Sequence, residues 1–245
     1  MAFSSTCLVL DPPLIEILHL QPADVSQSAS APVIPWRLDD HTISVMVSDT
    51  VDYSVSFWDR CRDAGIKQIL AVSLSPALHF RFQIGEWVRI GDHLNFLSRN
   101  PLIEFFRGRG IEFADVKQVY ADNRSPCRPI ESAVLLGLDH PSFITPAELR
   151  WYRSMGADVV DGRLLSIILT AYAAGMKCRA WSIVASRPDS VPNAPISSDG
   201  ELHDTIHNSQ TAPSPLVRSV SEPDSPRLSE RTLRESLIQH VIPFI

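Results

Sequence analysis

Segments with the apolar pattern of strands alternate along this chain with segments that have helical spacing. Uninterrupted or alternating apolar runs predict buried or half-buried strands. These runs are residues 6–10, 42–48, 66–72, 132–138, 157–160 and 178–184. Apolar residues spaced along one helical face predict helices. These segments are residues 55–64, 147–152, 164–174 and 229–242. Helices that alternate with strands are typical of an α/β domain.

Three parts of the chain differ in composition. Residues 1–186 carry most of these patterns and predict one α/β domain, with an exposed Ser, Ala and Pro-rich loop at residues 21–35. Residues 187–228 are rich in Ser, Pro, Asp and Asn, and they hold too few apolar side chains to offset the entropy of ordering. This part predicts a disordered segment. Residues 229–245 predict a C-terminal helix that docks on the domain.

Charge and cysteine usage narrow the classes of partner. The net charge of −6 and the pI near 5.7 provide no basic field for a nucleic acid or an anionic membrane. The first apolar run lacks a preceding basic region and is cut at Asp11, so we expect neither a signal peptide nor a spanning helix, and a cytoplasmic protein. Scattered cysteines predict thiols rather than disulfides or a zinc site. They are Cys7, Cys61, Cys127 and Cys178.

Two stretches contain short sequence motifs. The first has PSF at 141–143, TPAE at 145–148 and MGAD at 155–158. The second has FQIGE at 82–86, GDHLNF at 91–96 and RNPL at 99–102. Both stretches resemble the purine nucleoside phosphorylase family, of the trimeric low-mass type. The resemblance implies an α/β, three-layer nucleoside phosphorylase-like fold with a central mixed β-sheet flanked by helices.

The resemblance also implies a reaction and partners. Members of the family cleave purine nucleosides with phosphate, giving the free base and pentose 1-phosphate. The implied ligands are therefore a purine nucleoside and phosphate as co-substrate, with no other cofactor and no metal. The RNPL wording, which lies near subunit contacts in the family, implies a homo-oligomer that is a trimer by analogy.

The positions at which the family binds phosphate are substituted here. Asp11 with two following prolines replaces a glycine-rich loop, which adds a negative charge and removes backbone donors. Residues 48–53 replace a loop that bears an arginine and a histidine, so no cation is expected there. Ser73 and Leu74 begin the segment that replaces an Asn-Ala-Ala-Gly-Gly turn, and without glycine a close backbone approach to an anion is difficult.

The positions that hold the nucleoside are also changed. Phe143 keeps the aromatic residue of the purine site, but Ile144 replaces its glutamate and Ser186 replaces an asparagine. Gly162 and Arg163 fall where the family places a methionine on the sugar and a serine on phosphate. Arg163 has two interpretations, either a replacement donor to an anion or a solvated surface arginine beside Asp161, and the second is favoured.

These substitutions lead to competing hypotheses of function. The first is a nucleoside phosphorylase-family protein with weak or no activity, for which we assign no catalytic residue. The alternative is a non-catalytic relative that binds a ligand or another protein. A third is a different reaction on a nucleoside-like ligand. Two further pairs have structural interpretations that we favour: Asp92 with His93 as an acid–base pair, and His203 with His207 as metal ligands.

Overall fold

A computed structural model describes residues 5–22, 33–38, 41–107, 115–116, 118–121, 131–140, 144–187, 234–236 and 238–239. Within them the strands are β1 (Thr6–Leu10), β2 (Gln21–Pro22), β3 (Ile34–Leu38), β4 (His41–Val47), β5 (Gln68–Pro76), β6 (Trp87–Asn95), β7 (Glu131–Gly137), β8 (Val159–Val160) and β9 (Lys177–Ser186). The helices are α1 (Pro12–Ile17), α2 (Val55–Asp63), α3 (Pro101–Phe105), α4 (Pro146–Ser154) and α5 (Gly162–Ala173), with a 3₁₀ helix η1 (Ser48–Thr50).

The described strands form one mixed sheet in the order β2-β3-β4-β1-β5-β9-β6-β7-β8. The neighbours β4, β1, β5 and β9 run parallel, β6 runs antiparallel to β9, and β6, β7 and β8 are again parallel. The sheet curls, because a bridge joins Ala77, just after β5, to Val159 in β8. The expected α/β fold with a central mixed sheet flanked by helices is confirmed.

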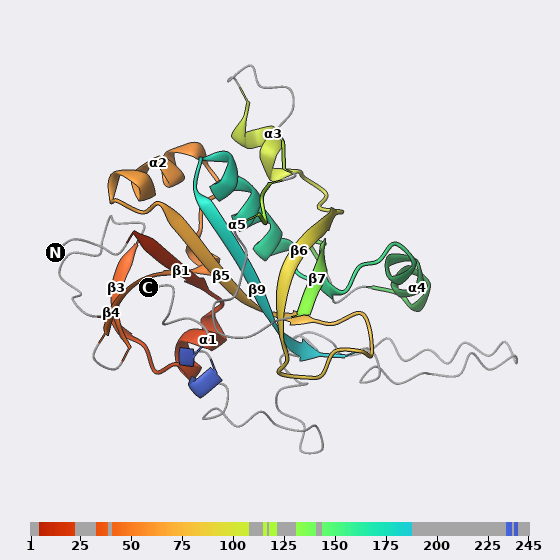
Figure 1. Cartoon of the computed structure of the whole chain (residues 1–245). Helices are drawn as coiled ribbons and strands as arrows, with labels where there is room; N and C mark the ends of the chain where they lie inside the picture. The colour runs from red at the N-terminus through yellow and green to blue at the C-terminus, as the bar shows by residue number, and fades with distance from the viewer. Residues whose placement is uncertain are drawn as a thin grey trace, which may run out of the picture.

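Alternation along the central strands divides the core into two layers. In β1, Cys7 and Val9 pack into the cluster that includes α2 and α5, whereas Leu8 and Leu10 pack with α1 on the opposite face. Successive side chains of a strand point to opposite faces, so one apolar run supplies both layers. Figure 1 shows α2 and α5 on one side of the sheet and α1 on the other.

The start of α5 brings chemistry to the edge of the sheet. Asp161 follows β8 directly and caps the helix, accepting a hydrogen bond from the Leu164 amide at 2.9 Å. The apolar sequence of the helix buries nearly its whole length against β5, β7 and β9. Because the helix is held firmly, its first residues have a fixed position relative to the strand ends.

Several sequence expectations need correction. Asp11 and the two prolines after it, which replace a glycine-rich loop of the family, form the start of α1, since proline suits the first turn of a helix, where its missing N–H is not needed. The loop expected at residues 21–35 contains β2 and the first residues of β3, which pairs antiparallel with β4. The segment that begins at Ser73 is the end of β5 rather than a turn, because it pairs with β9 as far as Pro76.

Further calls fall partly outside the described residues. Residues 234–236 and 238–239 are helical, and Ile238 packs beside the layer that contains α1. Residues 188–228, which include most of the expected disordered segment and both histidines of the metal pair, lie outside, as do Cys127 and Phe143. Cys7, Cys61 and Cys178 are free and buried.

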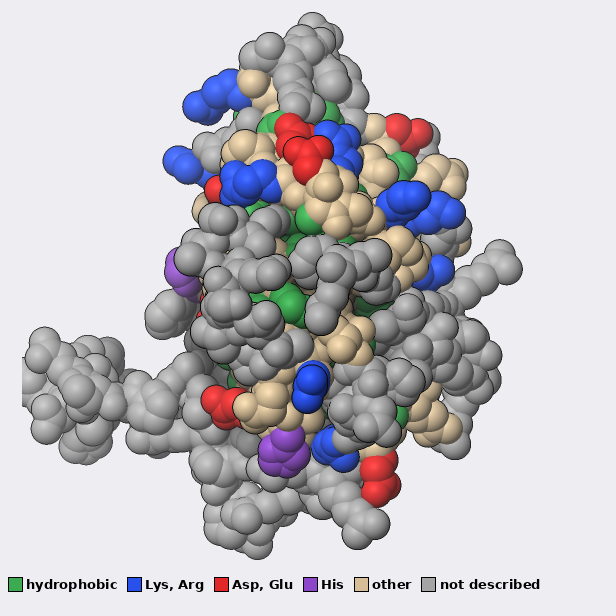
Figure 2. All heavy atoms as spheres, turned by 90° about the vertical axis from the view of Figure 1, so that its left-hand side faces the viewer, with side chains coloured by type: hydrophobic (Ala, Val, Ile, Leu, Met, Phe, Trp, Pro, Cys, Tyr) green, Lys and Arg blue, Asp and Glu red, His purple; other side chains and the backbone are tan. Residues whose placement is uncertain are grey.

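The charge and hydropathy of the described residues bear on whether a nucleic acid or a membrane could be a partner. On the face shown in Figure 2, acidic and basic side chains of the described residues lie interspersed. Hydrophobic side chains of the described residues show there only in small areas. Among the described helices, none has the length and apolar character needed to cross a bilayer.

Candidate functional site

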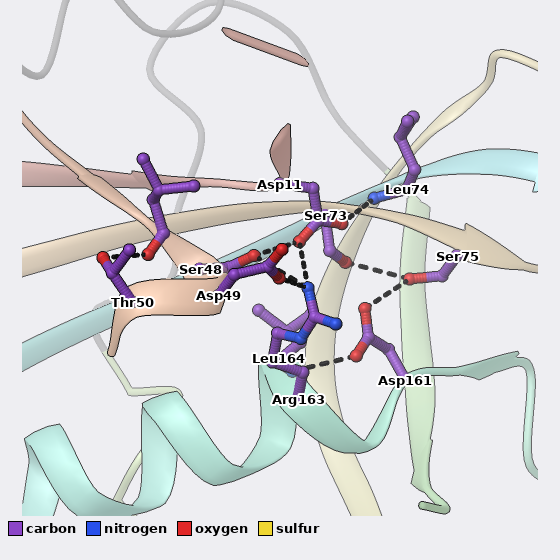
Figure 3. A network of polar contacts seen from close by, with 11 residues as sticks. Asp11, Ser48, Asp49, Thr50, Ser73, Leu74, Ser75, Asp161, Arg163 and Leu164 are labelled. Atoms are coloured by element: carbon purple, nitrogen blue, oxygen red, sulfur yellow. Dashed lines mark hydrogen bonds and ion pairs between the residues drawn. The ribbon is translucent and has the colours of Figure 1, made fainter. Parts of the chain in front are cut away.

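A network of polar side chains lies where several strands of the sheet end (Figure 3). Asp11 follows β1 and Ser48 follows β4. Ser73 and Ser75 are among the last residues of β5, and Asp161 follows β8. In open α/β sheets, ligands bind outside the carboxyl ends of the strands. The topology thus gathers side chains that are far apart in sequence at the edge where a ligand is expected.

Asp11 is the centre of this network. Its carboxylate accepts a hydrogen bond from the Ser48 hydroxyl at 2.7 Å and another from the Leu74 amide at 2.9 Å. Pairing between β1 and β5 stops at Leu10 and Val72, so the Leu74 amide lies beyond the last strand partner. The Asp11 side chain takes the place of that partner. It remains 15% exposed, so solvent reaches it.

Arg163 comes to the same place from the first turn of α5. Its guanidinium pairs with Asp49, donates to the Ser48 hydroxyl at 3.2 Å and lies 4.0 Å from the Asp11 carboxylate. The loop after β4 has no cation of its own, and α5 supplies one from outside the loop. Its partner is Asp49 rather than Asp161, and at 46% exposure it is neither buried nor fully solvated.

Serine hydroxyls lead from β5 to the second carboxylate. The hydroxyls of Ser73 and Ser75 lie 2.9 Å apart, and Ser75 donates to Asp161 at 3.5 Å. The other oxygen of Asp161 caps α5 at Leu164. Both serines are buried, so their hydroxyls are fixed by these contacts.

Burial changes the proton affinity of both carboxyl groups. Burial, and then the nearby charge of Asp11, raise the pKa of Asp161 to about 6. Burial also raises the pKa of Asp11, while the hydrogen bonds from Ser48 and Leu74 and the charge of Arg163 oppose that rise. The site is therefore a pair of interacting carboxyl groups in which Asp11 has the better-solvated and better-paired ionised form.

Comparison with known proteins identifies the family. Residues 59–220, more than half of the chain, match the family model described as the phosphorylase superfamily. The chain belongs to the nucleoside phosphorylase family. It is 28% identical over 149 residues to purine nucleoside phosphorylase 1 of Bacillus subtilis, covering 55% of this chain and 54% of that protein.

Other relatives agree with this membership. Purine nucleoside phosphorylase of Mycobacterium tuberculosis is 30% identical to this chain over 141 residues, and the match covers 56% of this chain and 50% of that protein. The chain thus spans about half the length of these curated relatives. The crystal structure of Schistosoma mansoni purine nucleoside phosphorylase with adenosine superposes with a TM-score of 0.63 at 16% identity, covering 97% of this chain and 88% of that one. This likeness shows the fold.

The structure brings only some of the positions named by the family resemblance together in the network. Ser73, Leu74 and Arg163 belong to the network, whereas Ile144 packs against the apolar cluster around Tyr152. The backbone carbonyl of Ser186 accepts the Ala77 amide at 2.9 Å at the end of β9.

Gly162 has a packing reason for its identity. A Cβ atom there would lie 2.5 Å from the Leu138 carbonyl oxygen and 2.9 Å from Leu97, closer than real Cβ contacts allow. Gly162 is therefore required because the chain just after β7 comes very close to the start of α5. A side chain at this position would push the start of the helix away from the network.

The remaining candidates lie elsewhere. The His93 ring contacts the Tyr120 hydroxyl at 3.2 Å, and Asp92 accepts from the His93 backbone amide, contacts that favour the structural interpretation. Among the described residues, no group of three or more His, Cys, Asp or Glu is arranged to hold a metal. A cavity of about 570 Å³ lies at the start of β9, lined by residues such as Phe106 and Met176, and no network residue lines it.

Sequence reasoning missed part of the network. It treated Asp11 only as a charge that repels phosphate and assigned no role to Ser48, Ser75 or Asp161. A usable signal was present, because each of these polar residues lies at or just beyond the end of an apolar run. The carboxyl ends of the parallel strands β1, β4 and β5 meet at one edge, which would have grouped Asp11, Ser48 and Ser75. Asp161 follows β8, which runs in the opposite direction, and it comes close where the sheet curls and Ala77 bridges Val159.

Proposed function

We propose that this chain is a nucleoside phosphorylase-family protein whose phosphate- and purine-binding positions are largely substituted, and that it performs phosphate-dependent cleavage of purine nucleosides weakly or not at all. The observation that carries the proposal is the Asp11 carboxylate, which accepts from the Leu74 amide and the Ser48 hydroxyl. By the family resemblance, these loops are where phosphate binds. The Asp11 carboxylate thus occupies hydrogen-bond donors that a bound phosphate would need.

Charge strengthens this argument. A phosphate dianion placed beside Asp11 would meet its negative charge, and at 4 Å two unit charges near a protein surface repel by about 4 kcal/mol. Arg163 offers incomplete compensation, because its guanidinium is already paired with Asp49. Phosphate binding would therefore require both the Asp11 contacts and the Arg163 pair to be broken.

The nucleoside side of the site supports reduced rather than ordinary catalysis. Ile144 replaces a carboxylate that holds the purine in the family and packs in an apolar cluster, and Ser186 replaces an asparagine. A lost transition-state contact costs about 2–4 kcal/mol, so two such losses lower the rate by roughly 10³-fold or more.

The test is release of base from inosine and guanosine at saturating phosphate, measured beside an intact family member. We expect cleavage by this protein to be at least about a thousandfold slower. The variant Asp11→Gly should increase phosphate binding, measured by calorimetry, because it frees the Leu74 amide and removes the repelling charge. Ile144→Glu combined with Ser186→Asn restores the nucleoside contacts in a parallel arm. Ordinary turnover by the unmodified protein would refute the proposal.

A second candidate function is a non-catalytic relative that binds a ligand or a partner protein. The simultaneous change of the phosphate and purine positions favours it, since binding alone does not need those groups. Thermal unfolding with inosine, guanosine or phosphate separates the two, because a bound ligand raises the midpoint. A shift with nucleoside but none with phosphate supports retained nucleoside binding. The homo-oligomer and the cytoplasmic location expected from the sequence stay predictions.

A further inference from the structure

Asp11 has the placement of a group that acts on a small molecule at the strand ends. Its backbone is fixed between β1 and α1, and its carboxylate is oriented by two donors, the Ser48 hydroxyl and the Leu74 amide. These donors occupy one position on each oxygen, Ser48 on one and Leu74 on the other. An ionised carboxylate has about four acceptor positions, so further hydrogen bonds can be made.

Solvent reaches this carboxylate, and its surroundings favour a moderate base. The side chain is 15% exposed, next to the half-exposed Arg163 and Asp49. Burial and the charge of Asp49 strengthen its hold on a proton, while Ser48, Leu74 and Arg163 weaken it. A carboxylate that is oriented by hydrogen bonds and reached by solvent is placed to accept a proton from a water molecule.

Asp161 is less suited to the same role. One of its oxygens caps α5 at Leu164 and the other accepts from Ser75, so its side chain is held inside the protein. Its position near Asp11 instead influences the proton affinity of the pair. In the hydrolysis of glycosidic bonds an ionised carboxylate can activate the attacking water, and Asp11 is the carboxylate of this pair that solvent reaches.

We propose that Asp11 is a general base that activates water, so that this chain hydrolyses the N-glycosidic bond of purine nucleosides instead of cleaving it with phosphate. The inference rests on the proposed function, which supplies the nucleoside. Water attacks the anomeric carbon while one of its protons passes to the Asp11 carboxylate. The carbon–nitrogen bond breaks, and its electron pair leaves with the base, which takes a proton from solvent. The products are free base and a reducing pentose.

The first experiment uses the unmodified protein. Inosine and guanosine are incubated in phosphate-free buffer and then with phosphate, and both free base and reducing sugar are measured. We expect base release at the same rate in both buffers, with one reducing pentose formed for each base. Because this arm needs no variant, it tests the inference even if a change at Asp11 prevents folding.

The second experiment compares two matched substitutions. Asp11→Asn keeps the size and an acceptor for Leu74 but cannot take a proton, so we expect kcat to fall by about 10²–10⁴-fold with little change in KM. The control Asp59→Asn alters an exposed carboxylate on α2 that pairs with Arg62, outside the network, and should leave the rate unchanged.

The outcomes separate this inference from the proposal on which it rests. Nucleoside binding without any phosphate-independent release overturns hydrolysis and leaves weak phosphorolysis intact. Ordinary phosphate-dependent release with pentose 1-phosphate as product overturns both. Phosphate-independent release that Asp11→Asn does not slow overturns the role of Asp11. Equal loss in the Asp59→Asn control would also count against it.

Discussion

Two carboxylates three residues apart belong to regions of different character. Asp158, before β8, accepts from the Arg81 guanidinium at 2.8 Å and from the Val134 amide at 2.9 Å. Asp161, after β8, lies near a second carboxylate, Asp11, and has a raised pKa. The first carboxylate is paired with a guanidinium that is 47% exposed and that also pairs with Glu131. The second is held in a place where its charge is disfavoured, as is typical of functional sites.

The segment around α4 shows why family wording can persist for structural reasons. Thr145 accepts from the Glu148 amide, and the Glu148 carboxylate accepts from the Thr145 amide at 2.8 Å, which forms a capping box. Gly156 has a φ of +89°, where a side chain would be strained. The recognisable TPAE and MGAD letters thus hold the chain in shape, whereas the letters at the strand ends, where ligands bind, are the altered ones.

The largest expected effect on stability comes from Asp158→Ala. Its carboxylate is 6% exposed, so its removal leaves the Val134 amide and one side of Arg81 without their acceptor. We expect the free energy of unfolding, measured by urea denaturation, to fall by about 2–4 kcal/mol. The control Asp59→Ala removes an exposed carboxylate and should change it by less than about 0.5 kcal/mol. Equal effects would contradict the structural role of Asp158.

The next effect has the opposite sign. The pKa of Asp161 is about 6 in the folded protein against an ordinary 3.8, so the folded state binds its proton more tightly than the unfolded state. The ionised form therefore costs stability above pH 6, and this cost is relieved as the pH falls from 6 to 4. Asp161→Asn keeps the helix cap and removes the charge, and should raise the free energy of unfolding at pH 7.5 by about 1–3 kcal/mol.

Urea denaturation of this variant at pH 7.5 and at pH 3.5 tests the sign. The difference between the variant and the unmodified protein should disappear at the lower pH, where both side chains are neutral. A variant that is less stable at pH 7.5 would mean that the contacts from Ser75 and Leu164 outweigh the cost of burying the charge.

A smaller effect is expected from the capping box. Thr145→Ala removes the hydroxyl that accepts the Glu148 amide and should lower the free energy of unfolding by about 1 kcal/mol. Thr145→Ser retains the hydroxyl and is expected to stay within about 0.5 kcal/mol of the unmodified protein. If the serine variant lost as much stability as the alanine variant, the cap would not be the cause.

The smallest effect belongs to the exposed pair in the network. Arg163 and Asp49 have side chains 46% and 51% exposed, so water screens their attraction. A double-mutant cycle with Arg163→Ala and Asp49→Ala should give a coupling energy of about 0.2–1 kcal/mol that decreases with salt. A coupling above about 2 kcal/mol would show that the pair behaves as a buried one.

Most elements of the fold were predictable from local pattern, and the failures have identifiable causes. The apolar run predicted at residues 6–10 has the bounds of β1, and the helix predicted at residues 55–64 agrees with α2 to within one residue. The helix α1 was not predicted, because proline after a strand is compatible both with a loop and with the first turn of a helix. The β6 strand was not assigned, since the GDHLNF stretch was interpreted through its family role rather than through its period.

The site was less predictable than the fold. The resemblance located Ser73, Leu74 and Arg163, but it described each by the group it had lost. Their partners, Asp11 and Asp49, were recognised only as substituted loops. A list of substitutions shows which contacts to a ligand are gone, and it does not show which new contacts the remaining groups make with one another.

The sequence by itself determined the net charge, the family motifs and the fold class. The fold class could be predicted because periodic burial and helix capping act between residues close in the chain. Only the tertiary structure decided that Asp11 completes the hydrogen bonding of Leu74, 63 residues away, and that Arg163 reaches Asp49 across 114. The reason is strand order. The sheet places the ends of β1, β4, β5 and β8 around the start of α5, and this arrangement depends on pairing between distant segments.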